Sequence, residues 1–108
     1  YNHYVLKGDL EKKKNILVEI ANALEPKRTE INEINKQLCS DYFYLINNMN
    51  IRHNNCDKTD MGKYNEKFDI LKSEEKEEWY DNIFQMGLLI YLLLENKKNS
   101  SKIKYFKQ

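Results

Sequence analysis

Hydrophobic residues recur at helical spacing in three long segments of the chain. The first segment begins at Asp9, whose side-chain oxygen can accept a hydrogen bond from a free backbone N–H at a helix start. Apolar residues then return every three or four positions, at Leu10, Leu17, Ile20, Ala21 and Leu24. Because this spacing places them on one helix face, the sequence predicts a helix over about residues 9–24.

Three consecutive lysines, Lys12, Lys13 and Lys14, lie within this predicted helix. Consecutive residues point in different directions around a helix, and lysine is almost never fully buried unless it is paired. We therefore expect three solvated side chains here, without a function of their own.

The second segment begins at Pro26, which lacks a backbone N–H and fits only the first turn of a new helix or a kink. A stripe of apolar residues follows at steps of three and four, at Ile31, Ile34, Leu38, Tyr42, Leu45 and Met49. This pattern predicts one helix over about residues 26–50. Since Tyr42, Phe43 and Tyr44 are consecutive, at least one of these rings has to leave the main stripe.

The third segment is the most apolar part of the chain. Ser73 can cap it, and four glutamates in its first turns suit the positive end of a helix dipole. The expected inner stripe consists of Trp79, Ile83, Met86, Gly87, Ile90, Leu93 and Leu94. The sequence predicts a helix over about residues 74–96, followed by a frayed basic tail over residues 97–108.

Residues 50–72 lack a hydrophobic period and are rich in Asn, Asp, Thr and Gly, which favour turns. A loop of this length in a compact domain is often functional. Its second half carries Tyr64, Phe68, Ile70 and Leu71, which we expect to pack on the core as a turn or short helix. The predicted fold class is all-α, a small bundle of three long helices plus a short helix or ordered loop. We expect residues 1–108 to form a single domain, and residues 1–8 look like the end of something cut from a longer protein or like a loosely packed lead-in.

Composition narrows the function classes. The chain has 108 residues, with 18 basic and 17 acidic side chains and a formal charge of +1, so no global field attracts nucleic acid or a membrane surface. Cys39 and Cys56 lack the spacing of a zinc site, and we expect two thiols in a cytoplasmic protein, with a disulfide as the alternative. The longest apolar run is too short to cross a membrane. We expect no cofactor, no metal and no membrane contact.

Reactive side chains are densest in residues 47–57, directly after the second predicted helix. Arg52 can bind a phosphate through its planar guanidinium, and His53 titrates near neutral pH and can act as acid or base. The candidate substrate-binding residues are Asn48, Asn54, Asn55 and Asp57. A structural interpretation is also open, in which Arg52 and His53 bind free carbonyls at the helix end and pair with Asp57 or Asp60.

The run LINNMNIRHNN, together with the later run EEWYDNIFQMGLLIYLLLE, resembles the HEPN superfamily of small helical domains. These domains occur in abortive-infection toxins, CRISPR-associated ribonucleases and other prokaryotic anti-phage systems. Their motif is an arginine, then a polar residue, then a histidine, with four to six residues between the arginine and the histidine. Arg52 and His53 fill the first two places, while the third would fall at residues 57–59, which contain no histidine.

The resemblance implies an HEPN-like dimer in which two arginine-containing loops face each other across a cleft where RNA is cut without a metal. Arg52 would hold the phosphate and His53 would act as acid or base. Two outcomes are open, a metal-independent endoribonuclease or an inactive relative that binds RNA, nucleotide or a partner protein. The expected context is a prokaryotic anti-phage or toxin protein, although a lysine-rich domain of a eukaryotic parasite fits the composition equally well.

The apolar last helix supports a different function. A helix that is apolar on most sides is buried or lies at an interface, and a bundle this small has too few helices to cover it. The alternative is therefore a non-catalytic interaction or dimerisation module that binds a protein through this helix. The expected partners are a second copy, the rest of a larger protein, or RNA.

Overall fold

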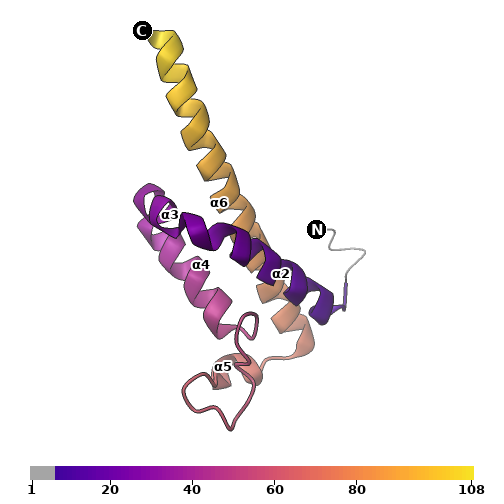
Figure 1. Ribbon diagram of the computed structural model, residues 1–108. Helices are drawn as coiled ribbons and strands as arrows, with labels where there is room; N and C mark the ends of the chain where they lie inside the picture. Colours follow the sequence, from indigo (N-terminus) through magenta and orange to yellow (C-terminus); the bar gives the residue numbers. More distant parts are fainter. Residues whose placement is uncertain (1–6) are drawn as a thin grey trace.

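In the computed structural model, which describes residues 7–108, the chain forms helices and, within that range, no strand (Figure 1). The all-α prediction is confirmed. The elements are α2 (Leu10–Leu24), a 3-10 turn η1 (Glu25–Lys27), α3 (Arg28–Ile34), α4 (Lys36–Asn48), α5 (Glu66–Asp69) and α6 (Ser73–Lys107). The expectation about the first residues falls mostly on residues 1–6, which lie outside the described range.

The helix α2 begins where the sequence predicts. The Asp9 carboxylate accepts a hydrogen bond of 3.0 Å from the Lys12 backbone N–H and so caps the helix. Leu17, Ala21 and Leu24 are buried on the face that packs against α6 and α4. Pro26 then lies in the 3-10 turn that separates α2 from α3, as its missing N–H requires.

The expectation for the three lysines is wrong for Lys13, whose side chain is buried. It lies one helical turn before Leu17, on the same inner face of α2. Its Nζ is 2.8 Å from Asp81 Oδ1 and 3.7 Å from Glu77 Oε1, and both carboxylates belong to α6. The Lys13 ammonium group is therefore neutralised by carboxylates of α6 instead of being solvated by water.

The second predicted helix is broken at Asn35, where the sequence predicts a continuous helix. The backbone of Asn35 is extended, with φ of −154° and ψ of 96°, and its side chain caps α4 by accepting a 3.0 Å hydrogen bond from the Leu38 N–H. The chain turns here, so that α4 folds back against α3 (Figure 1). A polar residue that satisfies the new helix start outweighs the continuous apolar period.

The core is centred on α4 and α6. Tyr42, Phe43 and Ile46 of α4 are fully buried, whereas Tyr44 is exposed, as expected for three consecutive rings. The Tyr42 and Phe43 rings meet edge to face, with centroids 5.1 Å apart. Gly87 lets α6 lie close to Tyr42 of α4 and Ile20 of α2, because a Cβ at this position would lie 3.4 Å from the Tyr42 ring and 3.1 Å from the Ile20 side chain.

The hydroxyl of Tyr42 is buried and has no hydrogen-bond partner among the described residues. Burial raises the pKa of Tyr42, although the nearby positive charge of Arg52 acts in the opposite direction. A buried hydroxyl without a partner is destabilising. We expect Tyr42→Phe to increase the free energy of unfolding by about 1 kcal/mol, measured by urea denaturation. Tyr44→Phe, at the exposed neighbouring ring, is the control and should leave it unchanged; a loss of stability in Tyr42→Phe would contradict the expectation.

The last helix departs from its predicted bounds at both ends. Ser73 is the first helical residue and not the cap, while the Glu75 carboxylate accepts a 3.1 Å hydrogen bond from the Lys72 N–H before it. At the other end the helix continues to Lys107, so the stretch predicted as a frayed tail is helical. Of the inner stripe, Ile83, Ile90 and Leu94 are buried, whereas Trp79 is 39% exposed.

The end of α6 projects beyond the bundle as a single helix (Figure 1). The radius of gyration is 16.2 Å and the longest axis 58 Å, whereas a compact domain of this length has a radius of gyration of about 13 Å. The projecting end of α6 therefore contacts little of the rest of the chain.

Within the described residues, no helix combines the length and apolar character needed to cross a bilayer.

Candidate functional site

Arg52 lies directly after α4 and binds back to the end of α2. Its Nη1 is 3.3 Å from Glu25 Oε2, and its Nη2 donates a 3.3 Å hydrogen bond to Asn22 Oδ1. Its backbone N–H donates a 3.2 Å hydrogen bond to the Ile46 carbonyl at the end of α4. The carboxylate partner is thus Glu25 and not Asp57 or Asp60, because the turn after α4 directs the guanidinium toward α2.

His53 and Asn54 occupy the surface of the same turn. His53 is half-buried and Asn54 is exposed, and within residues 7–108 the His53 imidazole forms no hydrogen bond or ion pair. The backbone carbonyl of His53 accepts a 3.0 Å hydrogen bond from the Asn55 N–H. The two predicted catalytic residues therefore differ, since Arg52 has protein partners and the His53 ring does not.

Asn55 is buried and holds the loop together, although the sequence suggested a substrate-binding role. Its Oδ1 accepts a 2.8 Å hydrogen bond from the Asn50 N–H, and its Nδ2 donates one of 2.6 Å to the Lys63 carbonyl. Its own carbonyl accepts a 2.8 Å hydrogen bond from the Asn65 N–H. Since its side-chain amide is used within the fold and only 1% of the residue is exposed, Asn55 cannot contact a ligand without rearrangement of the loop.

Asn65 completes this network, although its place in the sequence does not predict a role for it. Its Nδ2 donates a 2.9 Å hydrogen bond to the Asn48 carbonyl, and its Oδ1 caps α5 through the Phe68 N–H at 3.2 Å. The side chain of Asn48 donates to the Tyr44 carbonyl within α4. Asn48 and Asn55, predicted as substrate-binding residues, are therefore joined through Asn65 as parts of a structural loop.

Two features explain how the start of the loop is held. Asn50 has a left-handed backbone, with φ of 56°, at the point where the chain leaves α4. Tyr80 of α6 donates its hydroxyl toward the carbonyls of Met49 and Asn50, at 3.1 and 3.3 Å. Its ring stacks on Phe68, with centroids 6.0 Å apart. Phe68 packs on the core as predicted, while Ile70 is 72% exposed and does not.

Asp57 lies in a turn of its own and does not approach Arg52. Its Oδ1 accepts hydrogen bonds from the N–H and the hydroxyl of Thr59, at 2.9 and 2.6 Å. These hydrogen bonds stabilise the carboxylate and lower the pKa of Asp57. This is the local turn that Asp commonly forms, so the carboxylate is occupied within the loop.

A small cluster of titratable groups joins the loop to α5. The Tyr64 hydroxyl donates a 2.8 Å hydrogen bond to Asp69 Oδ2, which raises the pKa of Tyr64 to about 12. The same hydrogen bond, with a second one from Cys56, lowers the pKa of Asp69. Burial and the Asp69 carboxylate raise the pKa of the Cys56 thiol. Cys39 and Cys56 are both free, and a thiol with a raised pKa is a poor nucleophile.

We expect Tyr64→Phe to raise the pKa of Asp69 toward the value of an ordinary exposed aspartate, measured by carboxyl-carbon NMR titration. The pKa of Asp57 is the internal control, because Thr59 still donates to it. Since the folded-state pKa of Asp69 is lowered, the contact stabilises the fold above about pH 4, and this stabilisation is lost as the pH falls through the folded-state value. An unchanged Asp69 titration would contradict this assignment.

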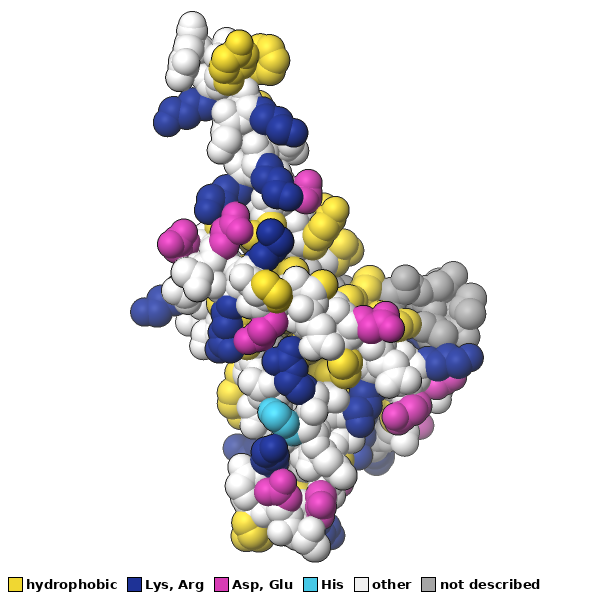
Figure 2. Space-filling model, viewed as in Figure 1, with side chains coloured by type: hydrophobic (Ala, Val, Ile, Leu, Met, Phe, Trp, Pro, Cys, Tyr) yellow, Lys and Arg dark blue, Asp and Glu magenta, His cyan; other side chains and the backbone are white. Residues whose placement is uncertain are grey.

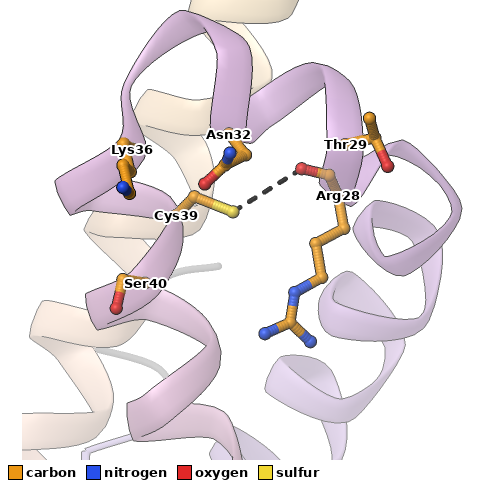
Figure 3. A pocket seen from close by; sticks show the side chains of 6 residues that line it. All are labelled: Arg28, Thr29, Asn32, Lys36, Cys39 and Ser40. Carbon is orange, nitrogen blue, oxygen red and sulfur yellow. Dashed lines mark hydrogen bonds between the residues drawn. The ribbon is translucent and has the colours of Figure 1, made fainter.

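A shallow pocket of about 460 Å³ lies between α3 and the start of α4 (Figure 3). It is lined by Arg28, Thr29, Asn32, Lys36, Cys39 and Ser40. The Cys39 thiol lies 3.6 Å from the Arg28 carbonyl, and the Arg28 guanidinium lies 4.6 Å from the centre of the Phe43 ring. Its two cations can attract a small anion, but Arg28 is already paired with Glu25 at 3.5 Å.

Exposed apolar side chains follow the side of α6 that faces away from the bundle. We define the outer face of α6 by seven exposed residues, Gln85, Leu89, Leu92, Asn96, Asn99, Ile103 and Phe106. Leu89 and Leu92 are about half exposed beside the bundle, and Phe106 is 84% exposed on the projecting end. Figure 2 shows hydrophobic side chains at the tip of this helix, beyond a section that carries lysines.

The chain matches no family model, no curated protein and no solved structure. The HEPN resemblance therefore stays a prediction. Within the described residues, no group of three or more His, Cys, Asp or Glu side chains is placed to hold a metal ion. Two candidate sites follow from the chain itself, the turn that carries Arg52 and His53, and the outer face of α6.

Proposed function

We propose that this chain is a helical interaction module that binds a protein through the outer face of α6. The observation that carries the proposal is the course of α6, which continues as a single helix beyond the bundle and exposes Leu89, Leu92, Ile103 and Phe106 on one side. An isolated helix as short as the projecting end of α6 is only marginally stable in water. Packing against a partner would stabilise it.

The chemistry of the surface agrees with this role. Exposed apolar patches rimmed by polar residues mark protein interaction sites in soluble domains. Leu89, Leu92 and Ile103 are each about half exposed, and on the projecting segment Lys102 and Lys104 flank Ile103. The expected partners are a second copy of the chain, the rest of a larger protein, or a separate protein with an apolar helix.

Site-specific photo-crosslinking tests this function. A benzophenone amino acid in place of Leu92 should give crosslinked protein adducts that map to the outer face of α6, and Leu89→Asp in the same chain should abolish them. The control places the same group at Thr29, which is exposed on α3. Adducts at neither position, or equal adducts at both, would overturn the proposal.

A second candidate is RNA cleavage or RNA binding of the HEPN type, with Arg52 as the phosphate ligand and His53 as acid or base. One observation favours it, the half-buried His53 ring that lies next to Arg52 without an intramolecular partner in residues 7–108. The ion pair between Arg52 and Glu25 weakens it, since a phosphate would have to compete with a carboxylate.

The test for this candidate is RNA cleavage in EDTA by the wild type, Arg52→Ala and His53→Ala. Cleavage that is lost in both variants while their unfolding transitions stay intact would support the nuclease. Equal activity in all three proteins, or activity in none, would remove it. RNA binding without cleavage, lost in Arg52→Ala, would support the inactive relative instead.

A further inference from the structure

The outer face of α6 has the period of a coiled coil. Its seven residues lie at alternating steps of four and three, from Gln85 through Leu89, Leu92, Asn96, Asn99 and Ile103 to Phe106. Steps of this kind keep one seam of side chains facing a partner helix. The seam spans three heptads, with apolar residues toward both ends and two asparagines in the middle.

We propose that the outer face of α6 pairs with the same face of α6 in a second copy, with the two helices antiparallel. This inference rests on the proposed interaction function and names its partner. The seam is self-complementary about a two-fold axis between residues 97 and 98. Leu89 then meets Phe106 of the second copy, Leu92 meets Ile103, and Asn96 meets Asn99.

Charge selects the antiparallel arrangement. Residues 97–108 contain five lysines and no acidic residue, and a parallel pair would bring two such segments side by side. The antiparallel pair separates them. It also places Glu95, at one flank of the seam, near Lys102 at the same flank of the second copy, and the symmetry makes this contact twice.

The fold leaves room for the second helix. The residues of α6 that pack on the bundle, including Ile83, Ile90 and Leu94, are buried on the side of the helix opposite the seam. The elements α2, α3 and α4 pack against α6 from that side. The projecting end (Figure 1) would therefore lie along Leu89 and Leu92 of the second copy, away from its bundle.

The composition of the seam predicts a reversible dimer. From Leu89 to Phe106 the paired part of the seam is ~26 Å long, short for a coiled coil, because Gln85 lies beyond the end of the second helix. Polar asparagines inside a seam reduce stability but fix the register. Asn96 and Asn99 would pair near the two-fold axis, and shifting the helices by one heptad would bury them against apolar side chains without hydrogen bonds.

Disulfide trapping tests the direction and the register. Purified Leu92→Cys and Ile103→Cys chains are oxidised separately and as a mixture, with the wild type, which has free Cys39 and Cys56, as the control. An antiparallel pair should give a linked dimer in the mixture and little in either variant alone. In the antiparallel pair, each position lies ~16 Å along the axis from the same position of the second copy, too far for a disulfide between two identical variants.

Charge exchange provides a second measurement. In sedimentation equilibrium, the wild-type chain should show a concentration-dependent dimer, and Glu95→Lys should weaken its association about tenfold by replacing two attractions with repulsions. Adding Lys102→Glu to that variant should restore association. Because Glu95 also pairs with Lys98 of its own helix at 3.4 Å, the helix content of both variants is measured by circular dichroism and should stay equal while association is lost and regained.

Three outcomes would overturn the inference. They are a monomer at all concentrations, disulfide dimers formed by each cysteine variant alone, and charge exchange without rescue. A monomer that nevertheless forms specific photo-crosslinks from position 92 to another protein would leave the interaction function standing and remove only the second copy as partner. A chain that neither dimerises nor forms specific photo-crosslinks from position 92 would remove the interaction function as well.

Discussion

Asn55→Ala is expected to lower the free energy of unfolding by about 2–4 kcal/mol. The substitution removes a buried amide that accepts from the Asn50 N–H and donates to the Lys63 carbonyl. Both backbone groups would lose their partners, and an unsatisfied buried polar group is destabilising in itself. Denaturant unfolding measures the loss, and hydrogen exchange should show faster exchange at the amides of Asn50 and Asn65.

Asn54→Ala is the matched control, because Asn54 is the exposed neighbour of the same residue type. Its stability should stay within about 0.5 kcal/mol of the wild type. Similar stabilities for the two variants would show that Asn55 is not the residue that organises the loop. A ligand role for Asn55 would require the opposite result, lost binding with unchanged stability.

The structural use of Asn55 has a consequence for the turn that carries Arg52 and His53. Hydrogen bonds from the Asn55 and Asn65 side chains and from the Tyr80 hydroxyl hold the loop in place. The turn is therefore fixed in position relative to α2 and α6. Any reaction at His53 would take place on a preorganised surface, and stability should be measured beside activity in every variant of this loop.

The sequence predicted the fold class well, because the evidence for it is repeated along the chain. Each apolar stripe is carried by many residues, so the all-α bundle, the cap at Asp9 and the turn at Pro26 could be predicted from spacing and backbone chemistry. Boundaries were predicted less well. One residue with an extended backbone, Asn35, divides the second predicted helix. The spacing of apolar residues does not reveal the backbone conformation of a single residue.

The candidate site was predicted less well, for a physical reason. Arginine and asparagine side chains serve equally for binding a ligand and for satisfying the backbone of a loop. Whether Arg52 faces a substrate or Glu25 depends on the direction of the turn after α4, which is set by contacts with residues distant in the sequence. Sequence spacing carries no information about those contacts.

Lys13 shows the same limit in the core. Three consecutive lysines are expected to be solvated. The face of α2 that Lys13 shares with Leu17 is nevertheless covered by α6. Glu74 and Glu75 lie in the first turn of α6, where they suit the helix dipole, whereas Glu77 and Asp81, in later turns, neutralise this lysine. The pairing depends on how α2 and α6 meet, which is a property of the fold.

Lys13→Ala is expected to lower the free energy of unfolding by about 2–3 kcal/mol, below the usual cost of breaking a buried pair because water partly reaches both carboxylates. Asp81 and Glu77 keep 22% and 18% of their side chains exposed, against 1% for Lys13. Lys12→Ala is the control, since that side chain is 70% exposed, and it should change stability by less than about 0.5 kcal/mol.

A second substitution separates charge from packing at this position. Lys13→Met keeps most of the buried chain length but removes the cation that Asp81 and Glu77 share, so it should recover only the packing part of the loss. Adding Asp81→Leu to Lys13→Met should recover more, because an apolar pair can replace a buried ion pair without loss of stability. Urea denaturation of the four variants measures these steps. If Lys13→Met alone were as stable as the wild type, the ion pair would contribute nothing, and the contact between α2 and α6 would depend on packing alone.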